Sequence, residues 1–169
     1  MIISLFISLF ISLSLSIPQV KVPSLCHTRP YLRAVYDDPE FICRNIWRKY
    51  GGWYDGNPAR LQPPRDSDLA LSVVTGFGGT LPLLRRVENL LESFEKDEKE
   101  GKYESADRSL RIARQLIEWA SRVPSDGESV HSLRRRVYQK SSEFAGALMA
   151  KGIYTSAMKE SEATLEAKL

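Results

Sequence analysis

Hydrophobic residues recur every three or four positions along most of the chain after residue 36, a spacing that predicts amphipathic helices. The clearest pattern lies between residues 80 and 101, where Thr80 and Pro82 open a helix and Gly101 ends it. Its apolar stripe consists of Leu83, Leu84, Val87, Leu90, Leu91 and Phe94. No convincing run of strands is found after residue 36, so the predicted fold class is all-α.

Four further segments follow the same spacing. A helix over residues 39–50 is capped by Asp37 or Asp38, and its apolar positions are Phe41, Ile42, Ile46, Trp47 and Tyr50. A short helix over residues 68–74, capped by Asp66 or Ser67, ends in the glycine-rich loop 76–79. A helix over residues 103–122 faces inward with Ala106, Leu110, Ala113, Ile117 and Ala120, and the next long helix does so with Val130, Leu133, Val137 and Tyr138.

The last segment, residues 144–169, carries Leu148, Met149, Ile153, Met158 and Leu165, and Gly152 is expected to break it into two helices. The sequence also places small residues and a proline close to the landmark positions of a tetratricopeptide helical hairpin; these are Gly101, Ala113, Ala120 and Pro124. Only one such unit is visible. The expected architecture is therefore a helical bundle with TPR-like helical hairpins, not a solenoid.

The N-terminal part differs in composition from the helices. Residues 1–17 are apolar with interspersed serines and no charged side chain, which is typical of a signal peptide, with a membrane anchor or an incomplete gene model as alternatives. A genuine leader would place the protein in the secretory or endomembrane system. Residues 18–36 contain three prolines and are expected to form an extended arm, leaving residues 37–169 as the folded domain.

The stretch 44–58, RNIWRKYGGWYDGNP, concentrates aromatic rings around a Gly-Gly pair. Glycines allow positive φ angles and close approach, and the residue before a proline is held extended. A helix end followed by a tight, aromatic-anchored turn is therefore predicted here.

Charge and residue chemistry narrow the function. The net charge is +3 with both signs intermixed, which argues against a nucleic-acid partner. Two isolated histidines, His27 and His131, provide neither an HExxH nor an HxHxDH pattern, and the loop 76–79 lacks the Lys-Ser/Thr of a phosphate-binding loop. The basic cluster of Arg134, Arg135, Arg136 and Lys140 is expected to be a solvated face. No catalytic or metal-binding residues are predicted.

The two cysteines leave one question open. Cys26 lies in the predicted arm and Cys43 in the first predicted helix. A buried free thiol at Cys43 is the expected outcome, and a single Cys26–Cys43 disulfide is the alternative for a secreted chain.

A specific likeness to a known family is carried by two segments: residues 20–63, which include RNIWRKYGGWYDGNP, and the later LMAKGIYTSAMKESEA. Over residues 20–167 the chain resembles the dimerisation domain of the metallo-β-lactamase-type alkyl sulfatases, the sodium dodecyl sulfate hydrolases. The resemblance implies a homodimer and a neighbouring catalytic domain that binds two zinc ions and hydrolyses alkyl sulfate esters. It also implies that Trp53, Tyr54, Asp55, Gly56, Asn57 and Pro58 form a loop facing that catalytic domain, without a role in proton transfer.

The likeness covers no zinc-binding domain, so this chain is expected to need no cofactor and to have no hydrolase activity of its own. We expect a homodimer that buries the apolar stripes of the last three helices, and membrane contact only through an uncleaved leader. Two alternatives remain: part of a complete zinc-dependent alkyl sulfatase, or a secreted helical adaptor that binds a peptide or an acidic partner through Arg134–Arg136.

Overall fold

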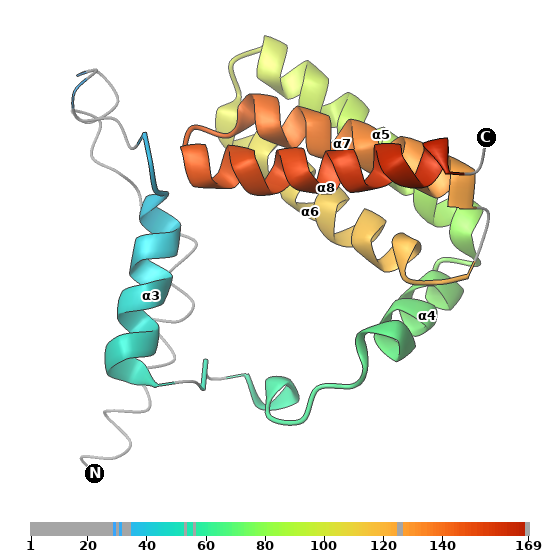
Figure 1. Ribbon diagram of the computed structural model, residues 1–169, viewed down its shortest axis with the longest axis horizontal. Coiled ribbons are helices and arrows are strands. Elements are labelled where there is room, and N and C mark those ends of the chain that lie inside the picture. The colour runs from blue at the N-terminus through green and yellow to red at the C-terminus, as the bar shows by residue number, and fades with distance from the viewer. Residues whose placement is uncertain are drawn as a thin grey trace. The chain divides into compact units, whose positions relative to one another are not determined.

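The computed structural model describes residues 29, 31, 35–52, 54–55, 57–124 and 127–167; the predicted leader and most of the predicted arm lie outside this part. Within it, every regular element is helical, with six α-helices and one 3-10 turn (Figure 1). The all-α prediction is therefore confirmed. The chain divides into two compact units, which are described separately: Met1–Pro63 with Gly146–Ala150, and Pro64–Ala145 with Lys151–Leu169.

The first unit contains α3 (Pro39–Gly51) and the 3-10 turn η3 (Pro58–Arg60). The Asp38 side chain accepts a hydrogen bond of 2.8 Å from the Glu40 amide, and Pro39 occupies the first helical turn. Asp38 is therefore the N-cap, as predicted, because its carboxylate satisfies an amide that the helix leaves unpaired. Gly52, with φ of 86°, ends the helix where the Gly-Gly pair predicts its end.

The first turn of α8 (Leu148–Glu166) also belongs to the first unit. Its Leu148 amide donates to the Val35 carbonyl at 2.8 Å, and its Met149 amide donates to the Tyr36 carbonyl at 3.1 Å. The first amides of a helix have no partner within the helix. The segment just before α3 therefore supplies two of the acceptors that α8 needs.

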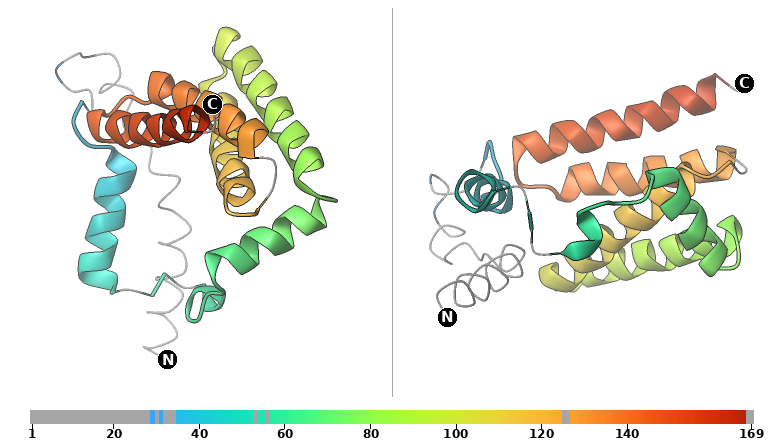
Figure 2. Two further views of the ribbon diagram at one scale, coloured as in Figure 1. Left: turned by 45° about the vertical axis from the view of Figure 1, so that its right-hand side comes forward. Right: turned by 90° about the horizontal axis from the view of Figure 1, so that it is seen from below.

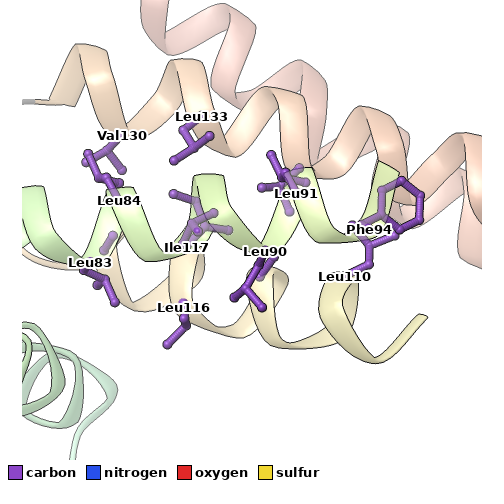
Figure 3. Packing of buried hydrophobic residues seen from close by; sticks show 14 of the residues in the cluster. Leu83, Leu84, Leu90, Leu91, Phe94, Leu110, Leu116, Ile117, Val130 and Leu133 are labelled. Atoms are coloured by element: carbon purple, nitrogen blue, oxygen red, sulfur yellow. The ribbon is translucent and has the colours of Figure 1, made fainter. Parts of the chain in front are cut away.

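The second unit is a helical bundle of α4 (Asp66–Gly76), α5 (Thr80–Lys99), α6 (Tyr103–Ser121) and α7 (Gly127–Phe144), with the rest of α8 beside it (Figure 2). Its core is built from the predicted stripes: Leu83, Leu84, Val87, Leu90, Leu91 and Phe94 of α5, Ala106, Leu110, Ala113, Ile117 and Ala120 of α6, and Val130, Leu133 and Val137 of α7 (Figure 3). The Phe94 ring meets the Phe144 ring edge-on, with 5.3 Å between centroids. Each helix thus buries the face that its periodicity indicates.

The α5–α6 hairpin turns at Gly101, whose φ of 73° lies in the left-handed region that glycine favours. On the facing side of α6, Ala106, Ala113 and Ala120 are completely buried. Small side chains at these positions let the helix backbones approach closely. This agrees with the small-residue landmarks in the sequence, whereas the likeness to a tetratricopeptide hairpin stays a prediction.

The expected break at Gly152 is wrong, because α8 continues through it from Leu148 to Glu166. An interior glycine costs only about 1 kcal/mol relative to alanine, which contacts on either side can offset. On the C-terminal side, Tyr154 stacks on Tyr138 at 6.0 Å and lies 4.7 Å from the Arg114 guanidinium. These contacts hold the helix in line beyond the glycine.

The short helix α4 is longer than predicted and begins at Asp66. Arg65, not Asp66 or Ser67, is the N-cap, and it makes no capping hydrogen bond through its side chain. The predicted glycine loop is confirmed, since α4 ends at Gly76 and both Gly78 and Gly79 have positive φ, 84° and 113°. Within the described part of the chain, no single helix is long and apolar enough to cross a membrane; α4 and α5 reach that length and composition only together, with an 85° bend between them.

Candidate functional site

The loop assigned to domain docking is ordered by its own polar groups. Trp53 and Gly56 of the predicted loop lie outside the described residues. Of the others, Tyr54 is exposed and Asp55 is half-buried. The Asn57 amide donates to Asp55 Oδ1 at 3.0 Å, and the Ala59 amide donates to Asn57 Oδ1 at 3.1 Å. These side-chain acceptors set the extended turn that leads into Pro58.

Asp55 is an ionised structural carboxylate in this arrangement. The hydrogen bond from the Asn57 amide and the ion pair with Arg60 lower the pKa of Asp55 below its ordinary value of 3.8. A carboxylate with a lowered pKa is a poor proton carrier near neutral pH. Asp55 therefore serves as a fixed acceptor within the loop, and the role of the loop toward a catalytic domain stays a prediction.

The apolar stripe of α3 is uncovered. None of the 13 residues of this helix is buried, and Ile42, Ile46 and Tyr50 are 45%, 52% and 77% exposed. Trp47 instead folds back on the helix end, since a Cβ at Gly51 would lie 3.0 Å from the Trp47 ring. The glycine at 51 thus makes room for the indole, while Ile42, Ile46 and Tyr50 on α3 remain exposed.

Other apolar side chains of the first unit are exposed as well. They are Val35, Tyr36, Leu61, Leu148 and Met149, at 67%, 67%, 52%, 58% and 43%. Among the described hydrophobic residues of this unit, the buried ones are Ala147 and Ala150. Two alanines do not make a hydrophobic core. Among its described residues, the first unit therefore leaves its large apolar side chains mostly exposed and has no core of its own.

Two of the three helices expected to supply the dimer interface, α6 and α7, do not expose their stripes, whereas Leu148, Met149 and Ile153 of α8 are 58%, 43% and 60% exposed. The stripe residues of α6 and α7 are at most 8% exposed, because they pack within the bundle of the second unit. The expectation that a dimer buries these stripes is therefore wrong for α6 and α7. Amphipathic spacing predicts that a face is covered, but it does not say whether the cover comes from the same chain.

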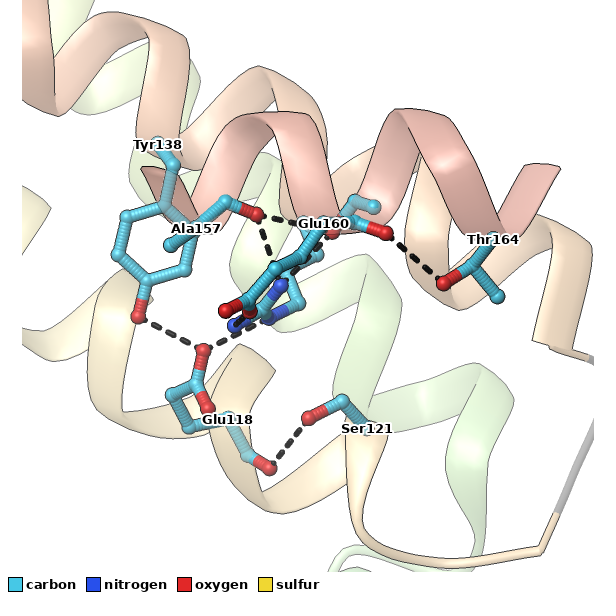
Figure 4. Close-up of polar contacts among 8 residues, drawn as sticks. Glu118, Ser121, Tyr138, Ala157, Glu160 and Thr164 are labelled. Carbon is cyan, nitrogen blue, oxygen red and sulfur yellow. Dashed lines mark hydrogen bonds and ion pairs between the residues drawn. The ribbon is translucent and has the colours of Figure 1, made fainter. Parts of the chain in front are cut away.

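A second feature, missed in the sequence, is the buried guanidinium of Arg134 on α7. Its Nε donates to Glu118 Oε1 at 2.7 Å, and its Nη1 donates to the Ala157 carbonyl and the Ser161 hydroxyl, both at 2.9 Å (Figure 4). The Tyr138 hydroxyl donates to the same Glu118 oxygen at 2.7 Å. We call Glu118, Arg134, Tyr138 and Ser161 the Arg134 cluster; it joins α6, α7 and α8.

The prediction of a solvated basic face is wrong for Arg134, which is 8% exposed. The helical spacing of the sequence indicates this burial, because Arg134 falls between Val130 and Tyr138 on the buried side of α7. Arg135 and Lys140 are partly exposed and form long ion pairs, Arg135 with Glu162 at 3.7 Å and Lys140 with Glu95 at 3.9 Å. Arg134 is therefore committed to internal bonds, which removes the central cation of the proposed acidic-partner site.

A model of the alkyl sulfatase dimerisation family matches residues 17–164. The chain belongs to this family. No curated protein matches the sequence. The match to this alkyl sulfatase dimerisation domain includes both units, so the exposed stripe of α3 and the Arg134 cluster lie within the family's own region.

Potential metal ligands and thiols are two further features of this dimerisation domain, because either can form a chemical site. Among the described residues, no group of three or more His, Cys, Asp or Glu side chains is placed to hold a metal ion. Cys43 is a free, half-buried thiol on α3. Cys26 lies outside the described residues.

Proposed function

We propose that this protein is a self-association module and that two copies form a homodimer through the first unit. The family match supports self-association. The observation that carries the assignment to the first unit is the unburied stripe of α3, Ile42, Ile46 and Tyr50. A helix of this length is marginal in water by itself and depends on burial of its apolar face. A second copy supplies that burial.

The size of the effect follows from the exposure. A fully buried isoleucine contributes about 1.5–3 kcal/mol relative to an exposed one. Ile42 and Ile46 are each about half exposed, and a two-fold interface uses each of them twice. Burying Ile42 and Ile46 of both copies therefore stabilises the dimer by about 3–6 kcal/mol before the costs of association. The other apolar residues of the first unit add to this.

Light scattering coupled to size exclusion, with the full chain over a range of concentrations, tests the proposal. The expected result is twice the chain mass at micromolar concentration, with Ile46→Asp weakening association by at least about tenfold. Ile112→Asp is the matched control, because Ile112 is 42% exposed but lies on α6 in the second unit. A monomer at every concentration, or equal loss in both variants, contradicts the proposal.

We propose further that the chain alone does not hydrolyse alkyl sulfate esters. In the enzymes that the sequence resembles, the zinc ions belong to a separate catalytic domain, and the match here is to the dimerisation domain. Purified protein, assayed on dodecyl sulfate with and without added zinc, is expected to release no sulfate. Genomic or transcript sequence upstream of Val20 tests the alternative: an open frame encoding HxHxDH would make this chain part of a complete sulfatase.

The loop with Tyr54, Asp55 and Asn57 is proposed to dock against such a catalytic domain. Support comes from its internal bonds, which order the backbone before any partner arrives. Asp55→Ala removes the acceptor of both the Asn57 amide and Arg60. It is expected to weaken binding to a metallo-β-lactamase-type domain supplied in trans, measured by calorimetry, while leaving the homodimer intact. Unchanged binding would contradict the docking role.

A further inference from the structure

The bend between α4 and α5 differs in composition from the rest of the described chain. Residues 69–84 contain no charged side chain, and residues 85 and 86 are both arginine. Charged residues make up 27% of the whole sequence, so a run of this length needs a physical explanation. We call residues 69–86 the elbow.

Part of the elbow serves the core of the second unit. Ala70 and Val74 of α4 are at most 4% exposed, and Leu83 and Leu84 of α5 are at most 7% exposed. Of the other large apolar residues of the elbow, Val73 is half-buried, and Leu69, Leu71, Phe77 and Leu81 are 41%, 55%, 40% and 63% exposed. The core therefore accounts for only half of the apolar run.

The exposed residues gather around a tight turn. Phe77 and Leu81 lie on either side of Gly78 and Gly79, whose φ angles of 84° and 113° let the chain turn by 85° from α4 into α5. Arg85 and Arg86 follow within the next turn and a half of α5 and are exposed. Within the described residues neither arginine forms an ion pair, so both cations are available to an external anion.

We infer that the elbow docks on an anionic lipid surface. Phe77 and Leu81 enter the boundary of the acyl chains, and Arg85 and Arg86 meet headgroup phosphates. Apolar side chains edged by cations are the pattern of segments that lie in a membrane interface. Within residues 69–86 no acid accompanies the two arginines, and the acids next to the elbow along the chain are Asp68 and Glu88. Because Leu83 and Leu84 stay in the core, the elbow lies on the bilayer and does not span it.

The test uses the full chain with Cys26 and Cys43 replaced by serine and a spin label at one new cysteine. Phe77→Cys carries the label at the elbow, and Ile112→Cys is the control, because these two side chains are 40% and 42% exposed. Vesicles of phosphatidylcholine with phosphatidylserine are expected to make the label at position 77 more accessible to oxygen and severalfold less accessible to a polar nickel reagent. The label at 112 is expected to stay unchanged. The label reports its own position, so binding by the leader alone leaves the reading at 77 unaltered.

A second pair of variants tests the charges. Arg85→Gln with Arg86→Gln is expected to abolish the dependence of the position 77 signal on phosphatidylserine. No change at position 77 on adding vesicles overturns the inference. A change at 77 that follows protein concentration instead of lipid also overturns it, because the elbow would then contact a second copy.

Discussion

Arg134→Ala is expected to cost the second unit about 2–3 kcal/mol of unfolding free energy. The side chain is buried and donates to Glu118, to the Ala157 carbonyl and to Ser161, with a longer contact of 3.4 Å to Glu160. Removing one partner of a fully buried ion pair costs about 3–5 kcal/mol. The cost here is smaller, since the Glu118 side chain is 27% exposed and keeps its hydrogen bond from Tyr138.

For a unit of this size, the loss corresponds to a fall in the midpoint of thermal unfolding of about 10 °C. Urea unfolding followed by far-ultraviolet circular dichroism, at one fixed protein concentration, measures the free energy. Arg134→Lys is expected to recover less than half of the loss, because an ammonium group cannot reproduce the planar fork of bonds. Arg136→Ala, on the same helix but exposed, is the control and should stay within about 0.5 kcal/mol of wild type.

The reasoning fails if Arg134→Ala and Arg136→Ala unfold at the same urea concentration. That outcome would mean that α8 does not depend on the guanidinium. A double-mutant cycle with Glu118→Gln separates the ion pair from the bonds to α8. A coupling energy near zero would assign the cost to Ala157 and Ser161 alone.

Three further predictions concern single sites. Gly152→Ala should raise the free energy of unfolding by about 0.5–1 kcal/mol, measured by thermal unfolding, because α8 is continuous and an added Cβ meets no atom within 4 Å. A destabilised variant would support the helix break that the sequence predicts. Arg60→Gln should raise the pKa of Asp55 toward 3.8, and a carbon-detected NMR titration measures this change. Because the pKa is lowered in the fold, the stabilisation of the fold by ionised Asp55 is complete above this ordinary value and is lost as the pH falls below it. Burial and the Glu118 carboxylate raise the pKa of Tyr138 above its ordinary 10.0, so an ultraviolet titration should find this phenol still protonated at pH 10. Its contribution to stability is complete below pH 10 and is lost at more alkaline pH, and ionisation of Tyr138 by pH 10 would contradict the buried bond.

Much of the fold can be predicted from local pattern. The helix predicted over 39–50 is observed over Pro39–Gly51, and the one predicted over 103–122 is observed over Tyr103–Ser121. These agree because a capping aspartate, a glycine turn and a 3.6-residue stripe act within a few residues of one another. Gly152 is the counterexample, since the contacts that keep α8 straight come from Arg114 and Tyr138 on other helices.

The candidate interface is less accessible to sequence reasoning. The stripe of α3 and that of α6 have the same helical spacing, yet one is exposed and the other completely buried. Only the three-dimensional arrangement shows which stripe a single chain covers. Arg134 is similar, because its acceptors on α8 are 23 to 27 positions away along the chain.

Hydrogen exchange of the α3 amides at two protein concentrations tests the central claim most directly. If a second copy covers Ile42 and Ile46, exchange in α3 is slow at high concentration and accelerates on dilution below the dimer dissociation constant. The α5 and α6 amides should exchange equally slowly at both concentrations, because their core lies within one chain. Exchange in α3 that is independent of concentration would contradict self-association through this helix.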